Sequence, residues 1–230
     1  MAGVFLLSAG LDSTVAMARF LQTEPGGLAL TFDYGQRAAN QEIDRAARIA
    51  AFYQVRHKAI KLPFLAEITN TALVNRGQAV PELDEADLDK TLSVTLQTAE
   101  QVWVPNRNGL FINVAAAFAE SLGYAAIVAG FNAEEAVTFP DNSPQFVHTV
   151  NEALAYSTLN QVKVVSPTAN LSKMEIVELG VALNIPWELV WSCYHGEHKM
   201  CGCCESCRRL IRALKAKGQN DILATLFEVL

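Results

Sequence analysis

This sequence of 230 residues has few basic residues, no long apolar run, and no cysteine outside one short segment. The chain has 18 lysines and arginines against 24 aspartates and glutamates, so its net charge is -6. That balance argues against a large non-specific nucleic-acid surface and favours small-molecule chemistry. The longest apolar stretches, residues 114–118 and 125–129, are far too short to span a bilayer, and no cleavable leader pattern follows Met1. We therefore expect a cytoplasmic protein with no membrane partner and no stable nucleic-acid binding.

Apolar runs alternate with helix-like segments along the chain, and 51% hydrophobic residues suffice for a substantial core. The runs typical of buried strands cover residues 4–7, 28–32, 55–60, 125–129 and 162–165. The helix-like segments cover residues 12–21, 40–52, 108–122, 143–157 and 172–183. This order predicts an α/β fold, an open parallel sheet with helices on both faces. Such sheets bind ligands at the carboxyl ends of their strands.

One segment, residues 69–98, interrupts the alternation and contains the acidic run PELDEADLD. A lid over a site is one interpretation of this segment. A solvated surface loop with a short helix is the other, and it is the more common origin of an acidic run.

The stretch LSAGLDSTVAM, residues 7–17, links the first predicted strand to the first predicted helix. Free amides at a helix N-terminus, the positive end of the helix dipole and the hydroxyls of Ser8, Ser13 and Thr14 make an anion site that suits phosphate. Asp12 repels a bare phosphate, but it fits as a helix cap or beside a bound Mg²⁺. An ordinary capped turn uses the same residue types, so the spacing supports both interpretations equally.

All five cysteines lie in SCYHGEHKMCGCCESCRRL, residues 192–210. Three of them repeat at CxxC spacing and a fourth lies eight residues upstream, so four thiolates can close a tetrahedral Zn²⁺ site. These four candidate ligands are Cys193, Cys201, Cys204 and Cys207. Cys203 can compete for the metal, and His195 or His198 can replace a thiolate. A closed four-sulfur site stabilises the fold of its segment and does not activate water.

Residues 8–13, SAGLDS, resemble the SGGLDS pyrophosphate loop of the ATP pyrophosphatases, whose fold is the adenine nucleotide alpha hydrolase-like or PP-loop fold. The loop differs from a Walker loop, whose GKS or GKT ending is absent. Ala9 stands where the family has its first glycine, and a methyl group is tolerated there only if the backbone has a negative φ and the phosphate does not press on Cβ. The resemblance implies that ATP binds along Leu7, Ser8, Ala9, Gly10, Leu11, Asp12, Ser13, Thr14, Val15, Ala16 and Met17.

Further blocks resemble the QueC family of queuosine biosynthesis over nearly the whole chain. They are TFDYGQR (31–37), VPNRN (104–108), FPDN (139–142), LSKMEIV (171–177) and WSCYHG (191–196), followed by the cysteine cluster. FPDN departs most, since many members have a tyrosine and a cysteine around that Pro-Asp pair. The resemblance implies a ligase that forms a carbon–nitrogen bond. Its substrates are 7-carboxy-7-deazaguanine, ammonia and ATP, and its products are 7-cyano-7-deazaguanine, AMP and pyrophosphate.

The same resemblance implies roles for single residues. The nucleotide base would lie by Asp33 and Tyr34, and the deazaguanine by Arg107, Asn108 and Asp141. The catalytic residues would be Ser8, Asp12, Ser13 and Lys173. Lys173 lies in the first turn of a helix, where a cation is electrostatically misplaced unless an anion compensates it. Structural alternatives remain, namely turns at Asp33 and Asp141 and a surface ion pair for Arg107.

We expect a PP-loop domain over residues 1–185 and a C-terminal zinc-binding helical segment over residues 186–230 packed on it. Structural Zn²⁺ and ATP with Mg²⁺ are the expected cofactors, and a homodimer follows from the resemblance alone. Three rival functions stay open: a tRNA thiolase of the same superfamily, a non-enzymatic zinc module, and a QueC-like paralogue that transfers the activated acid to a protein or nucleic acid. A tRNA thiolase needs reactive cysteines and a basic surface that binds tRNA. Consumption of ATP would exclude the non-enzymatic zinc module. Analysis of the products would distinguish the paralogue from a synthase.

Overall fold

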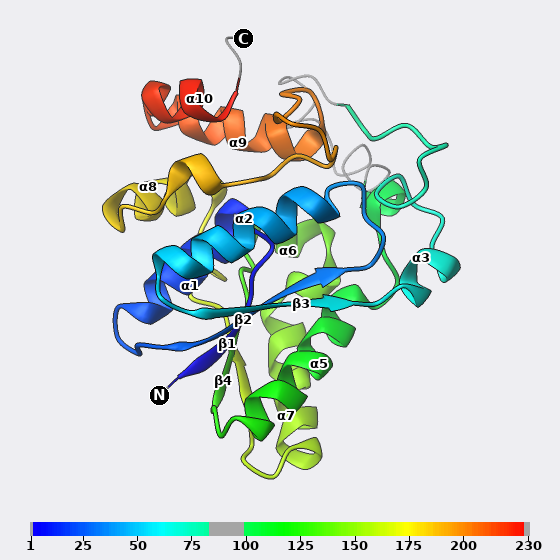
Figure 1. Ribbon diagram of the computed structural model, residues 1–230, viewed down its shortest axis with the longest axis vertical. Coiled ribbons are helices and arrows are strands. Elements are labelled where there is room, and N and C mark those ends of the chain that lie inside the picture. Colours follow the sequence, from blue (N-terminus) through cyan, green and yellow to red (C-terminus); the bar gives the residue numbers. More distant parts are fainter. Residues whose placement is uncertain (1, 83–98, 228–230) are drawn as a thin grey trace.

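Five parallel strands form a single sheet in the computed structural model, which describes residues 2–82 and 99–227. Their order across the sheet is β3-β2-β1-β4-β5, and each neighbouring pair is parallel. The strands are β1 (Gly3–Leu6), β2 (Gly27–Asp33), β3 (Arg56–Lys61), β4 (Ala126–Val128) and β5 (Lys163–Val165). All five lie where the apolar runs predict strands. The predicted open parallel α/β sheet is therefore confirmed (Figure 1).

Helices connect the strands. The α-helices are α1 (Leu11–Leu21), α2 (Ala39–Phe52), α3 (Phe64–Ile68), α5 (Arg107–Ser121), α6 (Ala133–Thr138), α7 (Pro144–Ser157), α8 (Lys173–Ala182), α9 (Glu205–Ala216) and α10 (Asn220–Leu226). Short 3-10 helices cover Pro140–Asn142 and Trp187–Leu189. The five predicted helices correspond to α1, α2, α5, α7 and α8. The capping box at Ser172 and Glu175 starts α8 as its sequence indicates.

The two faces of the sheet carry separate hydrophobic cores because neighbouring residues of a strand point to opposite faces. On β1, Phe5 belongs to the core shared with α1, α2, α8 and α9, whereas Val4 belongs to the core shared with α5 and α7. Figure 1 shows α1 and α2 on one side of the strands and α5 and α7 on the other. Helices thus cover both faces, as predicted for a parallel sheet.

The C-terminal segment packs against the first of these cores. Trp191, Leu210 and Ile211 share it with residues of α1 and α8. The segment is helical through α9 and α10, as expected, while a domain boundary at residue 185 stays a prediction. No helix within the described residues is long and apolar enough to cross a membrane.

The centre of the sheet is where the chain changes direction, since β1 lies between β2 and β4. The loops that follow β1 and β4 meet there, which is the usual ligand position in open α/β sheets. A Cβ atom on Gly130, just after β4, would lie 2.5 Å from the backbone nitrogen of Ser13 on α1. Glycine at residue 130 lets the loop after β4 touch the backbone of the first turn of α1.

The first part of the segment that interrupts the alternation is fixed to the rest of the protein. Arg37 donates hydrogen bonds to the carbonyl oxygens of Asn75 and Gln78, and Glu82 forms an isolated antiparallel bridge with Cys204. The acidic run beyond Glu82 lies outside the described residues. The choice between a lid and a surface loop therefore stays open.

Candidate active site

The loop between β1 and α1 is closed by the hydroxyls of Ser8 and Ser13. The Oγ atoms of these two serines are 3.2 Å apart, Gly10 donates its N–H to Ser8 Oγ at 3.3 Å, and Ser13 Oγ donates to the carbonyl of Gly10 at 3.1 Å. Gly10 is the N-cap of α1, and no side chain caps this helix. The interpretation of Asp12 as a helix cap is therefore wrong, because its carboxylate points elsewhere.

Ala9 adopts a left-handed backbone conformation, with a φ of 61°. The condition of a negative φ is therefore not met, and this chain places an alanine in a conformation that favours glycine. The Ala9 residue is fully buried in the core of the α1 face, and it does not belong to the lining of the nearby cavity. Its methyl group therefore packs into the protein and away from the ligand side of the loop.

Asp12 and Lys173, which are 161 residues apart, meet in a buried ion pair. Lys173 Nζ donates to Asp12 Oδ2 at 2.5 Å and to Glu135 Oε1 at 3.3 Å. Burial works against the lysine charge, but the carboxylates of Asp12 and Glu135 outweigh it and raise the pKa of Lys173. Burial raises the pKa of Asp12, and Lys173 only partly opposes that change. The lysine is thus a cation held in a fixed position beside the loop between β1 and α1.

Helix α6 completes this cluster through the residues that follow β4. Asn132 caps α6 by accepting the N–H of Glu135 at 2.8 Å, and its amide also donates to Asp12 Oδ2 at 3.4 Å. Glu134 Oε1 accepts the backbone N–H of Lys173 at 2.7 Å. The start of α8 is therefore held against the loops after β1 and β4.

A cavity of about 300 Å³ opens at these strand ends. Ten of the residues predicted to bind ATP or the substrate or to take part in catalysis line it: Leu7, Ser8, Gly10, Leu11, Asp12, Ser13, Tyr34, Arg107, Asn108 and Lys173. Seven others do not: Ala9, Thr14, Val15, Ala16, Met17, Asp33 and Asp141. Residues 14–17 are buried along α1, so any role of theirs in nucleotide binding stays a prediction.

Arg107 and Tyr34 pair across the cavity. Arg107 Nη1 donates to the Tyr34 hydroxyl at 3.2 Å, and both side chains are at least half-buried. Burial opposes the Arg107 charge, but Tyr34 and Asp141 outweigh it and raise the pKa of Arg107. The structure therefore gives Arg107 a buried partner in place of a surface ion pair. Asp33 accepts the N–H of Gly35 at 3.1 Å, the contact expected of a strand-end turn.

The carboxylate of Asp141 is directed to its own turn. Its Oδ1 accepts the amide of Asn142 at 3.3 Å, and its backbone carbonyl accepts the Asn108 amide at 3.4 Å. Asn108 and Asn142 line the cavity, whereas Asp141 does not. A contact between Asp141 and the deazaguanine stays a prediction.

Several cavity residues were missed by the sequence reasoning. They are Gln36, Glu42, Glu134, Glu135, Tyr194, Glu205 and Arg209. Arg209 on α9 donates twice to Glu205 Oε1, at 3.0 and 2.7 Å. Gln36 belongs to the TFDYGQR block and Glu42 follows it in α2, so that block contained a usable indication of both.

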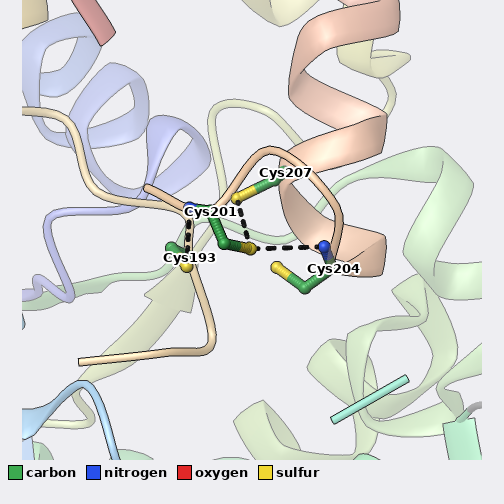
Figure 2. Close-up of side chains that lie close together, drawn as sticks. All are labelled: Cys193, Cys201, Cys204 and Cys207. Atoms are coloured by element: carbon green, nitrogen blue, oxygen red, sulfur yellow. Dashed lines mark hydrogen bonds between the residues drawn. The ribbon is translucent and has the colours of Figure 1, made fainter. Parts of the chain in front are cut away.

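The four predicted cysteine ligands converge at the start of α9 (Figure 2). One Sγ atom from each lies within 4.8 Å of the others. A tetrahedral zinc–thiolate site with bonds of about 2.3 Å has sulfurs about 3.8 Å apart, so the cluster is of the right size. Cys201 N donates to Cys193 Sγ at 3.4 Å, and Cys204 N donates to Cys201 Sγ at 3.3 Å. These amides stabilise thiolates, and the donor set fits a structural Zn²⁺.

Cys203 is not one of the four clustered cysteines: its Sγ donates to Glu82 Oε1 at 3.4 Å, although its side chain also interacts with that of Cys201. Among the described residues, the one group of ligating side chains of metal-binding size comprises the four cysteines and neither histidine. The structure thus favours the all-cysteine set over the alternatives with Cys203, His195 or His198.

Comparisons with known proteins identify the family of this chain. A family model described as "Queuosine biosynthesis protein QueC" matches residues 2–218. The chain is 55% identical to a 7-cyano-7-deazaguanine synthase of Desulforamulus reducens over 96% of both chains. It is 46% identical to one of Methanosarcina mazei over 97% of both. Among solved structures, a 4-thiouridine synthetase complexed with RNA and ATP shares the fold, with a TM-score of 0.50 at 17% identity over 97% of this chain and 52% of that one. The chain contains the loop of residues 8–13, which we call the phosphate loop, and the cysteine cluster. Together with a match along nearly all of its length, they show that this chain belongs to the QueC family.

Proposed function

We propose that this protein is a 7-cyano-7-deazaguanine synthase, which converts 7-carboxy-7-deazaguanine, ammonia and ATP into the nitrile, AMP and pyrophosphate. The observation that carries the proposal is one cavity lined both by the phosphate loop with Lys173 and by Tyr34, Arg107 and Asn108. A nucleotide and a flat carboxylic acid can meet in such a cavity. The match to relatives named for this activity supports the same reaction.

Activation of the carboxylate is the difficult step, because oxide is a poor leaving group. A carboxylate oxygen attacks the α-phosphorus of ATP, an acyl adenylate forms and pyrophosphate leaves. The loop hydroxyls of Ser8 and Ser13, the amides at the start of α1 and the fixed charge of Lys173 stabilise the negative charge that accumulates on pyrophosphate. Because Asp12 and Glu135 orient the Lys173 ammonium in advance, little reorganisation accompanies this step.

Ammonia then attacks the acyl carbon, and AMP leaves to give the amide. The amide oxygen then attacks the α-phosphorus of a second ATP, and a second pyrophosphate leaves. Loss of AMP together with the two amide protons produces the nitrile. The acid and the amide bind in the same cavity beside the same phosphate loop, so one site serves both adenylations. Positioning of the reactants supplies most of the catalysis in such transfers. No side chain of the protein is needed as a nucleophile.

Two metal ions complete the proposal. Asp12 Oδ1 is buried and has no hydrogen-bond partner in the described part of the chain, so Asp12 is the residue that would hold Mg²⁺ beside the ATP phosphates. When bound, Mg²⁺ would neutralise part of the negative charge of the phosphates. Zn²⁺ would be held by Cys193, Cys201, Cys204 and Cys207 and would stabilise the C-terminal segment.

We further propose that the protein works in the cytoplasm as a homodimer and without stable nucleic-acid binding. The net charge of -6 supports the last point, and the dimer rests on the family resemblance. Sedimentation of the purified protein at several concentrations tests the dimer, and a monomer at all of them contradicts it.

Mass spectrometry of the protein incubated with Mg-ATP, ammonium and 7-carboxy-7-deazaguanine tests the function. We expect nitrile and AMP from the wild type and neither product from an Asp12→Ala variant. AMP without free nitrile or amide would contradict the synthase and identify a paralogue that uses a macromolecular acceptor. Absence of AMP with every substrate present would contradict ATP-dependent activation altogether.

A further inference from the structure

Glu42 is an acidic group in the cavity that the reaction described above does not use. It lies in the first turn of α2, half-buried, and its side chain lines the cavity. Burial raises the pKa of Glu42 to about 7, even though the Gln36 hydrogen bond and Arg107 oppose that change. A buried carboxylate lowers the stability of the protein, and buried titratable groups in a cavity are typical of functional sites.

One oxygen of Glu42 is held in a fixed position by Gln36. Gln36 Nε2 donates to Glu42 Oε2 at 2.8 Å and also to the carbonyl of Phe32 at 2.9 Å. Gln36 Oε1 accepts the N–H of Tyr34 at 2.9 Å, so both ends of this amide are occupied and it cannot turn over. Gln36 is the one hydrogen-bond donor to the Glu42 carboxylate among residues 2–82 and 99–227, which leaves Oε1 and the second lone pair of Oε2 for a ligand.

Aromatic rings line the same cavity. Phe32 and Phe111 stack with their centroids 4.0 Å apart and their planes within 7°, and Tyr34 is 5.8 Å from Phe111. All three residues belong to the lining of the cavity together with Glu42. Flat rings and an oriented carboxylate suit a planar heterocycle that presents hydrogen-bond donors along one edge.

We propose that Glu42 determines substrate specificity by accepting hydrogen bonds from N1–H and the 2-amino group of 7-carboxy-7-deazaguanine. This inference rests on the proposed function. The edge of a deazaguanine presents two adjacent donors, which match a carboxylate. The corresponding edge of adenine presents the donor N6 beside the acceptor N1, whose lone pair a carboxylate repels. The acid substrate, and not ATP, is therefore the partner of Glu42.

The test compares Glu42→Gln with Asp44→Asn, a control on the same helix whose side chain is 67% exposed. We expect Glu42→Gln to raise KM for the acid about 10- to 100-fold, the loss typical of a hydrogen bond to a charged group, and to change KM for ATP by less than about twofold. Asp44→Asn should change neither. Thermal unfolding of Glu42→Gln checks that the fold is kept, since a glutamine can still accept the Gln36 amide.

An analogue without the 2-amino group, 7-carboxy-7-deazahypoxanthine, makes the test specific. The wild type should bind the acid more tightly than the analogue in calorimetry, and Glu42→Gln should lose most of that difference. An increase in KM for ATP alone, unchanged discrimination in Glu42→Gln, or loss of discrimination in Asp141→Asn instead would overturn the inference. Because calorimetry needs no turnover, failure of the wild type to make nitrile would refute the proposed function separately.

Discussion

Ala9 holds a φ of 61° at the tightest point of the phosphate loop, where the related pattern has glycine. A left-handed conformation costs an alanine roughly 1–2 kcal/mol. Two effects favour alanine over glycine, namely the smaller entropy of its unfolded chain, roughly 0.4–1 kcal/mol, and burial of its methyl group, about 0.8 kcal/mol. The terms nearly cancel, which explains how this chain can keep an alanine there.

Ala9→Gly should therefore change the free energy of unfolding by less than about 1 kcal/mol. Because the methyl group lies on the core side of the loop, KM for ATP should also stay within about twofold of the wild type. Denaturant unfolding and steady-state kinetics measure the two quantities. A tenfold fall in KM for ATP on removing the methyl would contradict its placement away from the phosphates.

At the scale of elements, the site depends on how closely α1 approaches the end of β4. Gly130→Ala places a methyl group 2.5 Å from the backbone nitrogen of Ser13, and backbone atoms cannot yield as a flexible side chain can. We expect a loss of stability of about 1–3 kcal/mol and a larger relative loss of activity, because the phosphate loop must shift. Gly77→Ala is the control, since its Cβ meets only the side chain of Asn75, at 3.2 Å. Equal activity of the two variants would argue against a rigid junction.

The strands and the long helices could be predicted from the sequence because their apolar patterns are periodic and their bounds carry turn residues. Helices α3 and α6 could not, since five and six residues are too few to show a helical period. The left-handed φ of Ala9 was also missed, because an alanine gives no indication of such a conformation.

Contacts within the site could be predicted where the residues are close in sequence, as for the hydroxyls of Ser8 and Ser13. Contacts that depend on tertiary packing could not. The pair of Lys173 and Asp12 joins segments 161 residues apart, and Arg209 reaches the cavity only because α9 packs on α8. Gln36 and Glu42 are six residues apart, yet their contact depends on the turn between β2 and α2.

For the molecule as a whole, the cysteine cluster connects stability to activity. It fixes the start of α9, and α9 brings Glu205 and Arg209 into the cavity. Cys201→Ser should lose the bound zinc, lower Tm by about 2–4 °C for each kcal/mol of stability lost, and lower activity in parallel. Metal analysis, calorimetry and the product assay measure these effects.

Cys203→Ser is the matched control for that experiment, because the Cys203 thiol contacts Glu82 and lies outside the cluster. Zinc content and activity should stay close to those of the wild type. Complete loss of activity with zinc retained would contradict a mechanism without a protein nucleophile.

In the proposed reaction, one cavity uses ATP twice, first to activate the acid and then to activate the amide made from it. The most direct measurement is the ratio of AMP to nitrile in the product mixture, taken once from the acid and once from the amide. We expect two AMP per nitrile from the acid and one from the amide, with neither product from Asp12→Ala. Accumulation of the amide as the final product, or AMP without any nitrile, would contradict this reaction.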